Sequence, residues 1–413
     1  MTRILKTTGL ATFVLLAGCL APAAAQPIPP EGPAIDPAVY KVPAGAKTVN
    51  VDCDDQKQTL GAAVSDRTAV DLNIVFTGTC KENFSIMRDN VAIRGKDATA
   101  TIVGSVEVNS AKRVLLENFT CRDNTQIEYC IGAVHGASVS LHNIKVQNAA
   151  VRGVMILNSV AVIEGLNVDK TLSTSILIRG SDVRLEGEQT FAHTLEGCVV
   201  VDNVSSVFSK SGVFNARDCG SGILVQSNSN FHAPFATFNL NANSLTGLML
   251  LTSGTFSYGG QFTAKNNTLA GVFADDGSSF SPFTNIVGGS TLTLENNGTA
   301  GILVRSSFAE VVNVTANTGS KFGMFVEDGR IRIGRGGKAT DNKTADIRLT
   351  FGSKAVFLEG STIGTLSCDG TEMLRGNKVP CTQDKDSEAK PTVKPTTETK
   401  PAAKPDSAPV KKQ

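Results

Sequence analysis

The stretch that decides the fold reads Gly301-Ile-Leu-Val-Arg-Ser-Ser-Phe-Ala-Glu-Val-Val-Asn-Val-Thr-Ala-Asn-Thr-Gly-Ser-Lys-Phe-Gly-Met-Phe-Val326. It begins and ends on the same phrase, a glycine followed by three apolar residues, with a short Val-Val-Asn-Val strand and an Asn-rich turn between the two copies. The phrase or a close variant recurs at steps of 21 to 30 residues, starting at Gly132, Gly153, Ser175, Gly197, Gly222, Gly247, Gly271, Gly301, Gly323 and Asp346.

A near-constant step of this size indicates a solenoid in which each repeat forms one coil. The repeats hold short β-forming runs separated by Asn and Gly turns. They lack the long helix-forming units of helical repeats and the regular Leu/Asn frame of leucine-rich repeats. The sequence therefore predicts a parallel β-helix of about a dozen coils.

The N-terminal part carries a second pattern, which reads Val49-Asn-Val-Asp-Cys53, Gln58-Thr-Leu-Gly-Ala-Ala-Val64, Val75-Phe-Thr-Gly-Thr-Cys80 and Val91-Ala-Ile-Arg-Gly95. Together with the glycine rungs, it resembles the secreted right-handed parallel β-helix proteins of the pectate-lyase-like superfamily, from about Val49 to Cys381. The resemblance implies an all-β chain, a single-stranded right-handed parallel β-helix with a short N-terminal cap helix that plugs the first coil. It does not specify an activity, because this superfamily includes lyases, hydrolases, epimerases and adhesins.

Composition divides the chain into four segments. Residues 1–25 carry two cations and then a short apolar run, as in a secretory signal peptide. Residues 26–47 are rich in Pro and Ala and predict an extended linker. Residues 48–381 form the β-helix domain. Residues 382–413 contain repeated Lys-Pro pairs and few apolar residues, so this Lys/Pro/Thr-rich tail is predicted to be a disordered spacer.

The signal segment offers two cleavage sites. The run Leu-Ala-Gly-Cys19 fits the lipobox of a lipoprotein, in which Cys19 becomes the lipidated first residue, whereas Ala-Ala-Ala25 fits ordinary cleavage before Gln26. The first site predicts a protein anchored to the outer membrane by lipid, and the second predicts a periplasmic or extracellular protein. Both predict export into or beyond a bacterial-type envelope.

Eight of the nine cysteines lie beyond the signal segment, and an even number in an exported chain predicts disulfide bonds. The sequence spacing pairs Cys53 with Cys80, Cys121 with Cys130, and Cys368 with Cys381. The pair Cys198 and Cys219 is left open, because Cys198 falls on an inward strand position where a buried free thiol is common.

The alternation of side chains along a β-strand assigns the faces of each rung. With the glycine as position zero, positions one and three point inward and form the core. Position two points outward, yet it is apolar in eight consecutive rungs, which we call the apolar stripe: Met155, Leu177, Val199, Leu224, Met249, Phe273, Leu303 and Phe325. At about 4.8 Å per coil the stripe is about 34 Å long, and soluble monomers rarely expose such a strip. Its cover is either the chain itself, through the linker or loops, or a partner that includes a second copy.

Position four carries a group that resembles a catalytic site, Asp275, Arg305 and Glu327, with Asp276 beside the first residue. Two carboxylates two coils apart would lie about 9.6 Å from each other, near the separation found in inverting glycoside hydrolases. Arg305 lies between the two acids in register, however, so an acid–base–acid salt-bridge ladder explains the same pattern without chemistry.

Other motifs exclude several classes of function. The net charge of +1 gives no field that would attract nucleic acid, and membrane contact is expected only through the lipid anchor. The four histidines show no metal-ligand spacing, so no metal and no cofactor is predicted.

Two functions from different classes remain. The first is an exported, non-catalytic binding or structural module of the envelope or surface, whose partner is a protein or a cell-surface glycan and which can form a homo-oligomer. The second is a polysaccharide lyase, hydrolase or epimerase that acts on a uronic-acid polymer. The absence of Trp and the low number of Tyr weigh against an aromatic sugar-binding cleft.

Overall fold

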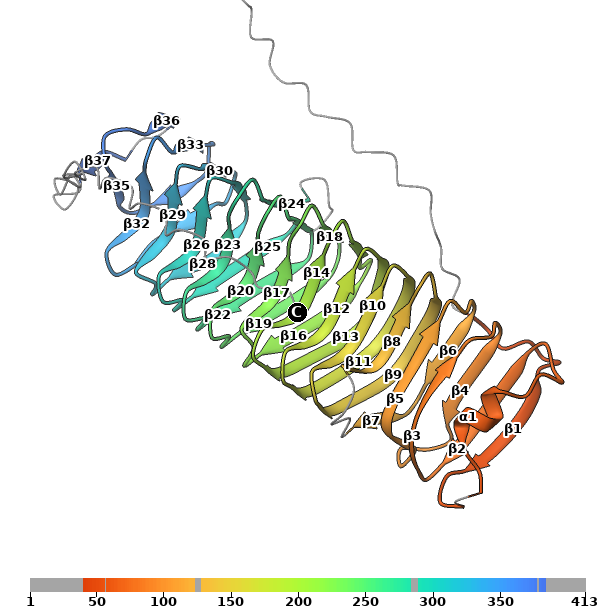
Figure 1. Cartoon of the computed structure of the whole chain (residues 1–413). Coiled ribbons are helices and arrows are strands. Elements are labelled where there is room, and N and C mark those ends of the chain that lie inside the picture. The colour runs from red at the N-terminus through yellow and green to blue at the C-terminus, as the bar shows by residue number, and fades with distance from the viewer. Residues whose placement is uncertain (1–39, 56, 123–127, 284–288, 377–378, 384–413) are drawn as a thin grey trace, which may run out of the picture. The chain divides into compact units, whose positions relative to one another are not determined.

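A computed structural model of the chain describes residues 40–55, 57–122, 128–283, 289–376 and 379–383. These residues form a right-handed parallel β-helix of about 14 turns with almost no helix (Figure 1). Each coil contributes strands to three faces, which we call faces I, II and III. Equivalent strands of successive coils pair in parallel, as predicted from the rung repeat.

Face I consists of β1 (Lys47–Asp52), β2 (Leu72–Thr77), β4 (Val91–Gly95), β6 (Val114–Glu117), the first halves of β9 (Ser138–Ala149), β11 (Val160–Thr171) and β13 (Asp182–Thr194), then β15 (Ser206–Phe208), β18 (Asn230–Ala233), β21 (Thr255–Tyr258), β24 (Ser279–Pro282), β27 (Phe308–Val311), β30 (Arg330–Ile333), β33 (Lys354–Phe357) and β36 (Met373–Arg375). Face II consists of the first halves of β3 (Thr79–Ile86) and β5 (Thr101–Asn109), then β7 (Thr120–Arg122), the second halves of β9, β11 and β13, and β16 (Gly212–Arg217), β19 (Thr237–Asn241), β22 (Gln261–Lys265), β25 (Thr291–Glu295), β28 (Val314–Thr318), β31 (Lys338–Ala339) and β34 (Thr362–Ile363).

Face III holds the glycine rungs. It consists of the ends of β3 and β5, then β8 (Tyr129–Val134), β10 (Arg152–Leu157), β12 (Thr174–Arg179), β14 (Gly197–Asp202), β17 (Ser221–Val225), β20 (Thr246–Leu250), β23 (Ala270–Ala274), β26 (Ala300–Arg305), β29 (Phe322–Glu327), β32 (Ala345–Thr350), β35 (Leu366–Cys368) and β37 (Cys381–Gln383).

A single short helix, α1 (Leu60–Val64), caps the first coil of the described solenoid. The Thr59 side chain accepts a hydrogen bond from the backbone N–H of Ala62, and the Glu82 carboxylate accepts hydrogen bonds from the backbone N–H groups of Leu60 and Gly61 at 2.6 and 2.9 Å. These acceptors satisfy helix N–H groups that have no partner within the helix. Leu60 and Val64 are buried in the main core, which confirms the predicted cap helix.

The interior is a continuous apolar core that runs along the solenoid. In its middle coils, Phe side chains of successive rungs stack on one another. The rings of Phe214 and Phe238 lie parallel with centroids 4.9 Å apart, and those of Phe256 and Phe280 lie parallel at 6.2 Å. Aromatic stacking adds to the area that these rings remove from water.

A buried asparagine ladder turns the chain from face II into face III. Asn267 accepts hydrogen bonds at Oδ1 from the backbone N–H and the Nδ2 group of Asn243, both at 3.0 Å. It donates from Nδ2 to Oδ1 of Asn297 and to the carbonyl of Leu240, both also at 3.0 Å. Asparagine side chains in successive turns therefore satisfy one another's buried hydrogen-bonding groups without water.

Close packing between coils explains why most rungs of face III begin with glycine. A Cβ atom at Gly301 would lie 2.2 Å from Oδ1 of Asn317 and 2.7 Å from the carbonyl oxygen of Gly323. No real side chain tolerates contacts that short, so the first residue of the glycine phrase lets one coil approach the next closely.

Candidate functional site

The outward-pointing side chains of face III form an apolar layer on the outer side of the β-helix. The strand register places Met155, Leu177, Val200, Leu224, Met249, Phe273, Leu303 and Phe325 in one column. Met155, Leu177, Val200, Phe273 and Leu303 are only 4–7 % exposed, and the other three are partly buried. The apolar stripe is therefore a packed outer layer rather than a row of isolated surface residues.

One member of the stripe was predicted wrongly. Val199 pairs with Ile176 and Ile223, two inward residues, and is fully buried in the main core. Val200 takes the outward position instead. The rung that contains them begins one residue later than expected, because Cys198 rather than Gly197 lies opposite Gly222.

A similar shift affects the first rung, where Gly132 lies opposite Met155 and so occupies the outward position itself rather than position zero. The Tyr129 ring lies over Gly132, where a Cβ atom would come within 2.4 Å of the ring. Tyr129 packs with Met155, Leu177 and Val200 and so extends the apolar layer toward the N-terminus. Burial, together with the adjacent Glu107 carboxylate that accepts a hydrogen bond from its hydroxyl group, raises the pKa of Tyr129.

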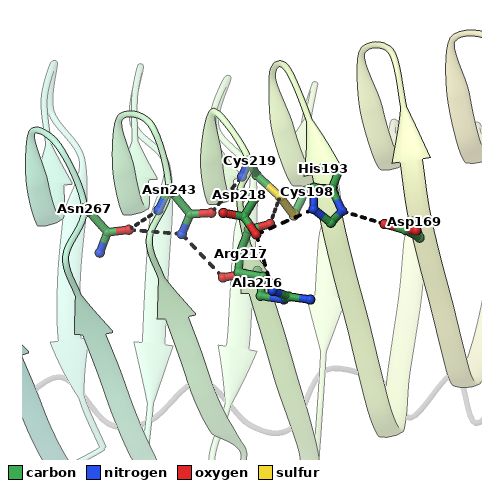
Figure 2. The surroundings of a disulfide bond; sticks show 9 residues. All are labelled: Asp169, His193, Cys198, Ala216, Arg217, Asp218, Cys219, Asn243 and Asn267. Carbon is green, nitrogen blue, oxygen red and sulfur yellow. Dashed lines mark hydrogen bonds and ion pairs between the residues drawn. A yellow bond between two sulfur atoms is a disulfide. The ribbon is translucent and has the colours of Figure 1, made fainter.

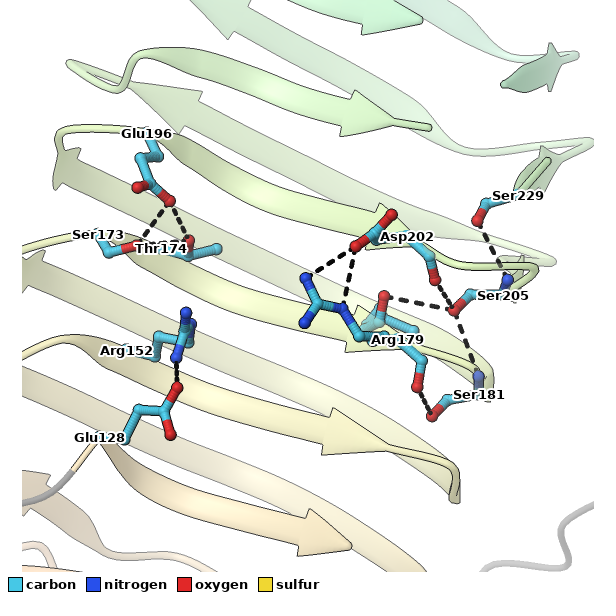
Figure 3. Close-up of polar contacts among 11 residues, drawn as sticks. Glu128, Arg152, Ser173, Thr174, Arg179, Ser181, Glu196, Asp202, Ser205 and Ser229 are labelled. Carbon is cyan, nitrogen blue, oxygen red and sulfur yellow. Dashed lines mark hydrogen bonds and ion pairs between the residues drawn. The ribbon is translucent and has the colours of Figure 1, made fainter. Parts of the chain in front are cut away.

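Polar side chains border the N-terminal half of this layer on both edges (Figure 3). On one edge Arg152 pairs with Glu128, and Glu196 accepts hydrogen bonds from the hydroxyl groups of Ser173 and Thr174. On the other edge the guanidinium of Arg179 contacts Asp202 from Nε at 3.0 Å and from an Nη atom at 2.8 Å. These contacts join side chains of neighbouring coils and give the apolar layer charged rims of both signs.

The fold controls the charge state of Asp202. Burial by itself raises the pKa of its carboxyl group, but hydrogen bonds from Ser227, Arg179 and Gln226 outweigh burial, and the pKa lies below its ordinary value. Asp202 is 7 % exposed, whereas the side chain of Arg179 is half exposed. The ion pair therefore places one nearly buried carboxylate at this edge of the apolar layer.

The candidate catalytic group lies on the C-terminal half of the same rim. Arg305 approaches Asp275 at 3.2 Å and Glu327 at 4.0 Å, and its guanidinium lies 5.1 Å from the ring centroid of Phe273. The arginine thus occupies the space between the two carboxylates that an inverting hydrolase would keep for water. Of the two interpretations of this pattern, the geometry favours a salt-bridge ladder over a catalytic site. Asp276 lies in the turn after β23, and its backbone N–H donates to Asp275.

Two acid–histidine–acid ladders cross the coils at other edges, and the sequence analysis missed both. His193 lies between Asp169, 2.6 Å from its Nδ1, and Asp218, 3.8 Å from its Nε2, with Arg217 3.5 Å from Asp218 (Figure 2). His193 and Asp218 both adopt positive φ in the turn that leaves face II. The rung spacing could have aligned these two turn residues, but the glycine phrase marks only face III.

The second such ladder runs along the outer edge of face I. His142 approaches Glu117 at 3.7 Å and Glu164 at 3.3 Å, and Glu117 also pairs with Arg94 at 2.9 Å. Its residues come from four successive coils, on β4, β6, β9 and β11. Linked cross-strand charge pairs of this kind hold neighbouring coils in register.

All four cysteine pairs of the sequence analysis are disulfide bonds, including the pair that was left open. They join Cys53 to Cys80, Cys121 to Cys130, Cys198 to Cys219 and Cys368 to Cys381. Cys198 and Cys219 connect successive coils beside the asparagine ladder, because the backbone N–H of Cys219 donates to Oδ1 of Asn243 (Figure 2).

One group among the described residues has the spacing of a metal site, formed by Cys368, Glu372 and Cys381. Its two cysteines are joined in a disulfide, which leaves a single carboxylate as a ligand. The lipidation candidate Cys19 lies outside the described residues. Within those residues, no helix is long and apolar enough to cross a membrane.

No protein-family model matches the chain, and no curated protein sequence matches it. Among solved structures, the A-module of a mannuronan C-5 epimerase from Azotobacter vinelandii is 15 % identical and covers 81 % of this chain and 98 % of its own, with a TM-score of 0.31. The receptor-binding domain of the siphovirus 9NA tailspike is 11 % identical and covers 81 % of this chain and 76 % of its own, with a TM-score of 0.41. At these values the similarity carries no argument about activity or ligand. The chain itself forms a right-handed parallel β-helix, which fits the pectate-lyase-like fold.

Proposed function

We propose that this protein is an exported, non-catalytic binding module whose face III holds a partner protein. The observation that carries the proposal is the outer apolar layer, in which eight rungs place apolar side chains on the outer side of face III between charged rims, and of which Leu224, Met249 and Phe325 are only partly buried. An apolar centre with a polar rim is the common anatomy of protein–protein interfaces. Four disulfides support export, because such bonds persist in oxidising compartments.

The chemistry of the layer favours a protein over a glycan as the partner on face III. A glycan presents many hydroxyl groups, and those facing aliphatic side chains would lose their hydrogen bonds to water without replacement. The rims carry both signs of charge, as in Arg179 with Asp202 and Arg305 with Asp275 and Glu327. A surface with both signs can complement itself across a two-fold axis, so a second copy of the chain is the partner to test first.

The test introduces charge into the layer with Phe273→Asp and Leu303→Asp together. Sedimentation velocity, limited proteolysis and the thermal midpoint are compared with wild type, while the far-UV spectrum checks that the β-helix persists. We expect either release of a dimer or larger assembly, or new protease cleavage if a segment of the chain itself is the cover. The control is Val213→Asp with Phe235→Asp, two residues that are 38 % and 55 % exposed on other parts of the coil. If the test variant behaves like wild type in all three measurements, the layer is not an interface.

One observation favours a second candidate function, an enzyme that acts on a uronic-acid polymer. Asp169 lies 2.6 Å from Nδ1 of His193, a contact that fixes the ring and leaves Nε2 to exchange a proton with a substrate. Asp218 lies on the Nε2 side at 3.8 Å, and the side chains of all three residues are more than a third exposed. The ladder geometry explains the same contacts by coil register alone, which is why binding remains the first proposal.

A further inference from the structure

A shallow depression of about 270 Å³ lies at the C-terminal end of face I. It spans β30, β33 and β36, whose labels stand at the blue end of the solenoid in Figure 1. Its lining combines three cations with apolar side chains: Arg330, Lys354, Arg375, Val356, Met373 and Leu374. Met373 is 65 % exposed and Leu374 is 36 % exposed, so the apolar part of the lining is open to solvent.

The charges of the depression differ from those of the rim ladders. In the rim ladders, a cation on one strand faces an anion on the next, as Arg305 faces Glu327. In the depression Arg330 lies directly opposite Lys354, and Arg375 follows on the next strand opposite Val356. Like charges directly opposite each other destabilise a sheet, so this arrangement costs stability.

Three acids on or next to the neighbouring strands have partners outside the depression. Glu310 pairs with Arg332 at 3.2 Å, and Asp328 accepts a hydrogen bond from Ser306 at 3.3 Å. Glu372 accepts a hydrogen bond from the backbone N–H of Gly370 at 2.9 Å. Within the described residues, no ion pair involves Arg330, Lys354 or Arg375.

We propose that this depression binds the carboxylate of an acidic glycan. Arginine presents a planar fork of donors that matches a carboxylate, and lysine adds a point charge. Arg330 and Lys354 face each other on neighbouring strands, and Arg375 lies on the following strand two residues further along. An anion between these cations would neutralise their mutual repulsion. The exposed Met373 and Leu374 side chains fit the apolar face of a sugar ring, which inorganic anions lack. The site lies on face I, so a test of this proposal is independent of the partner proposed for face III.

The test is isothermal titration of the full chain with a galacturonate tetramer, with its methyl ester and with inorganic phosphate. The ester keeps the sugar rings and removes the charges. We expect binding of the acid tetramer that weakens with salt, and much weaker binding of the ester and of phosphate. Arg330→Gln with Lys354→Gln should weaken binding of the tetramer by about tenfold or more, as for the loss of charge-assisted hydrogen bonds.

The matched control is Lys81→Gln with Lys210→Gln, which removes the same net charge from exposed positions in other coils. It should bind the tetramer like wild type. The double variant in the depression should not unfold earlier than wild type, because it removes a repulsion. Equal binding of acid and ester, binding of phosphate alone, no binding by wild type, or equal losses in test and control variants would each overturn the proposal.

Discussion

Asp202 illustrates at the scale of a single residue how the coils fix a charge. Its carboxylate is nearly buried, yet hydrogen bonds from Ser227, Arg179 and Gln226 hold its pKa below the ordinary value. The unfolded chain therefore binds a proton at Asp202 before the folded chain does as the pH falls. Its contribution to stability is complete above about pH 4 and is lost as the pH falls toward the folded-state pKa.

We predict that Asp202→Asn lowers the free energy of unfolding by about 1 kcal/mol at neutral pH, a modest value because solvent screens the half-exposed Arg179. The variant should also lose less stability than wild type on acidification below about pH 4. Urea unfolding at a series of pH values measures both effects. Asp182→Asn, which changes an exposed acid on β13, serves as the control. A parallel loss of stability with acid in Asp202→Asn and wild type would refute this account of the pKa.

Individual side chains also show which contacts can be predicted from the sequence and which cannot. The ladder of Asp275, Arg305 and Glu327 could be anticipated, because all three residues follow the glycine phrase at the same offset. His193 and Asp218 also share an offset, four residues before Gly197 and Gly222, but the apolar pattern of the glycine phrase does not extend to that turn. Their contact depends on the positive φ angles of the turn, which single residue types do not encode reliably.

At the scale of the strand and its turn, buried polar ladders matter as much as the apolar columns. Asn243, Asn267 and Asn297 recur at nearly the rung spacing, a signal that is present in the sequence. Apolar alternation does not identify them, because they lie in turns, where Asn is also common for other reasons. The same alternation placed Val199 outward, because Cys198 and not the preceding glycine starts that rung.

We predict that Asn267→Ala lowers the free energy of unfolding by about 3 kcal/mol, because it leaves buried partners above and below without hydrogen bonds. The side chain makes four hydrogen bonds at 3.0 Å and is 1 % exposed. Urea unfolding followed by circular dichroism measures the change. Asn239→Ala removes a partly buried asparagine that donates one hydrogen bond to Asn215, and it should cost far less. Equal costs in the two variants would mean that the ladder does not stabilise the turn.

At the scale of the whole molecule, the rung repeat predicted the solenoid because each coil touches mainly its neighbours. The first and last disulfides, Cys53–Cys80 and Cys368–Cys381, lie in the terminal coils, which have a neighbour on one side only. Alternation also predicted the outer apolar layer. What covers that layer could not be predicted, because an apolar pattern specifies burial and not the identity of the covering surface.

The central claim is that this β-helix binds its partners and does not transform them. The measurement that tests it most directly is prolonged incubation of the purified chain with polygalacturonate and with alginate at about pH 5 and about pH 8, a range over which an ordinary histidine changes charge. Mass spectrometry then follows chain length and unsaturation, and proton NMR follows epimerisation. The account predicts unchanged polymers for wild type, His193→Ala and Glu327→Gln alike. Cleavage, desaturation or epimerisation by wild type that is lost in either variant would contradict it.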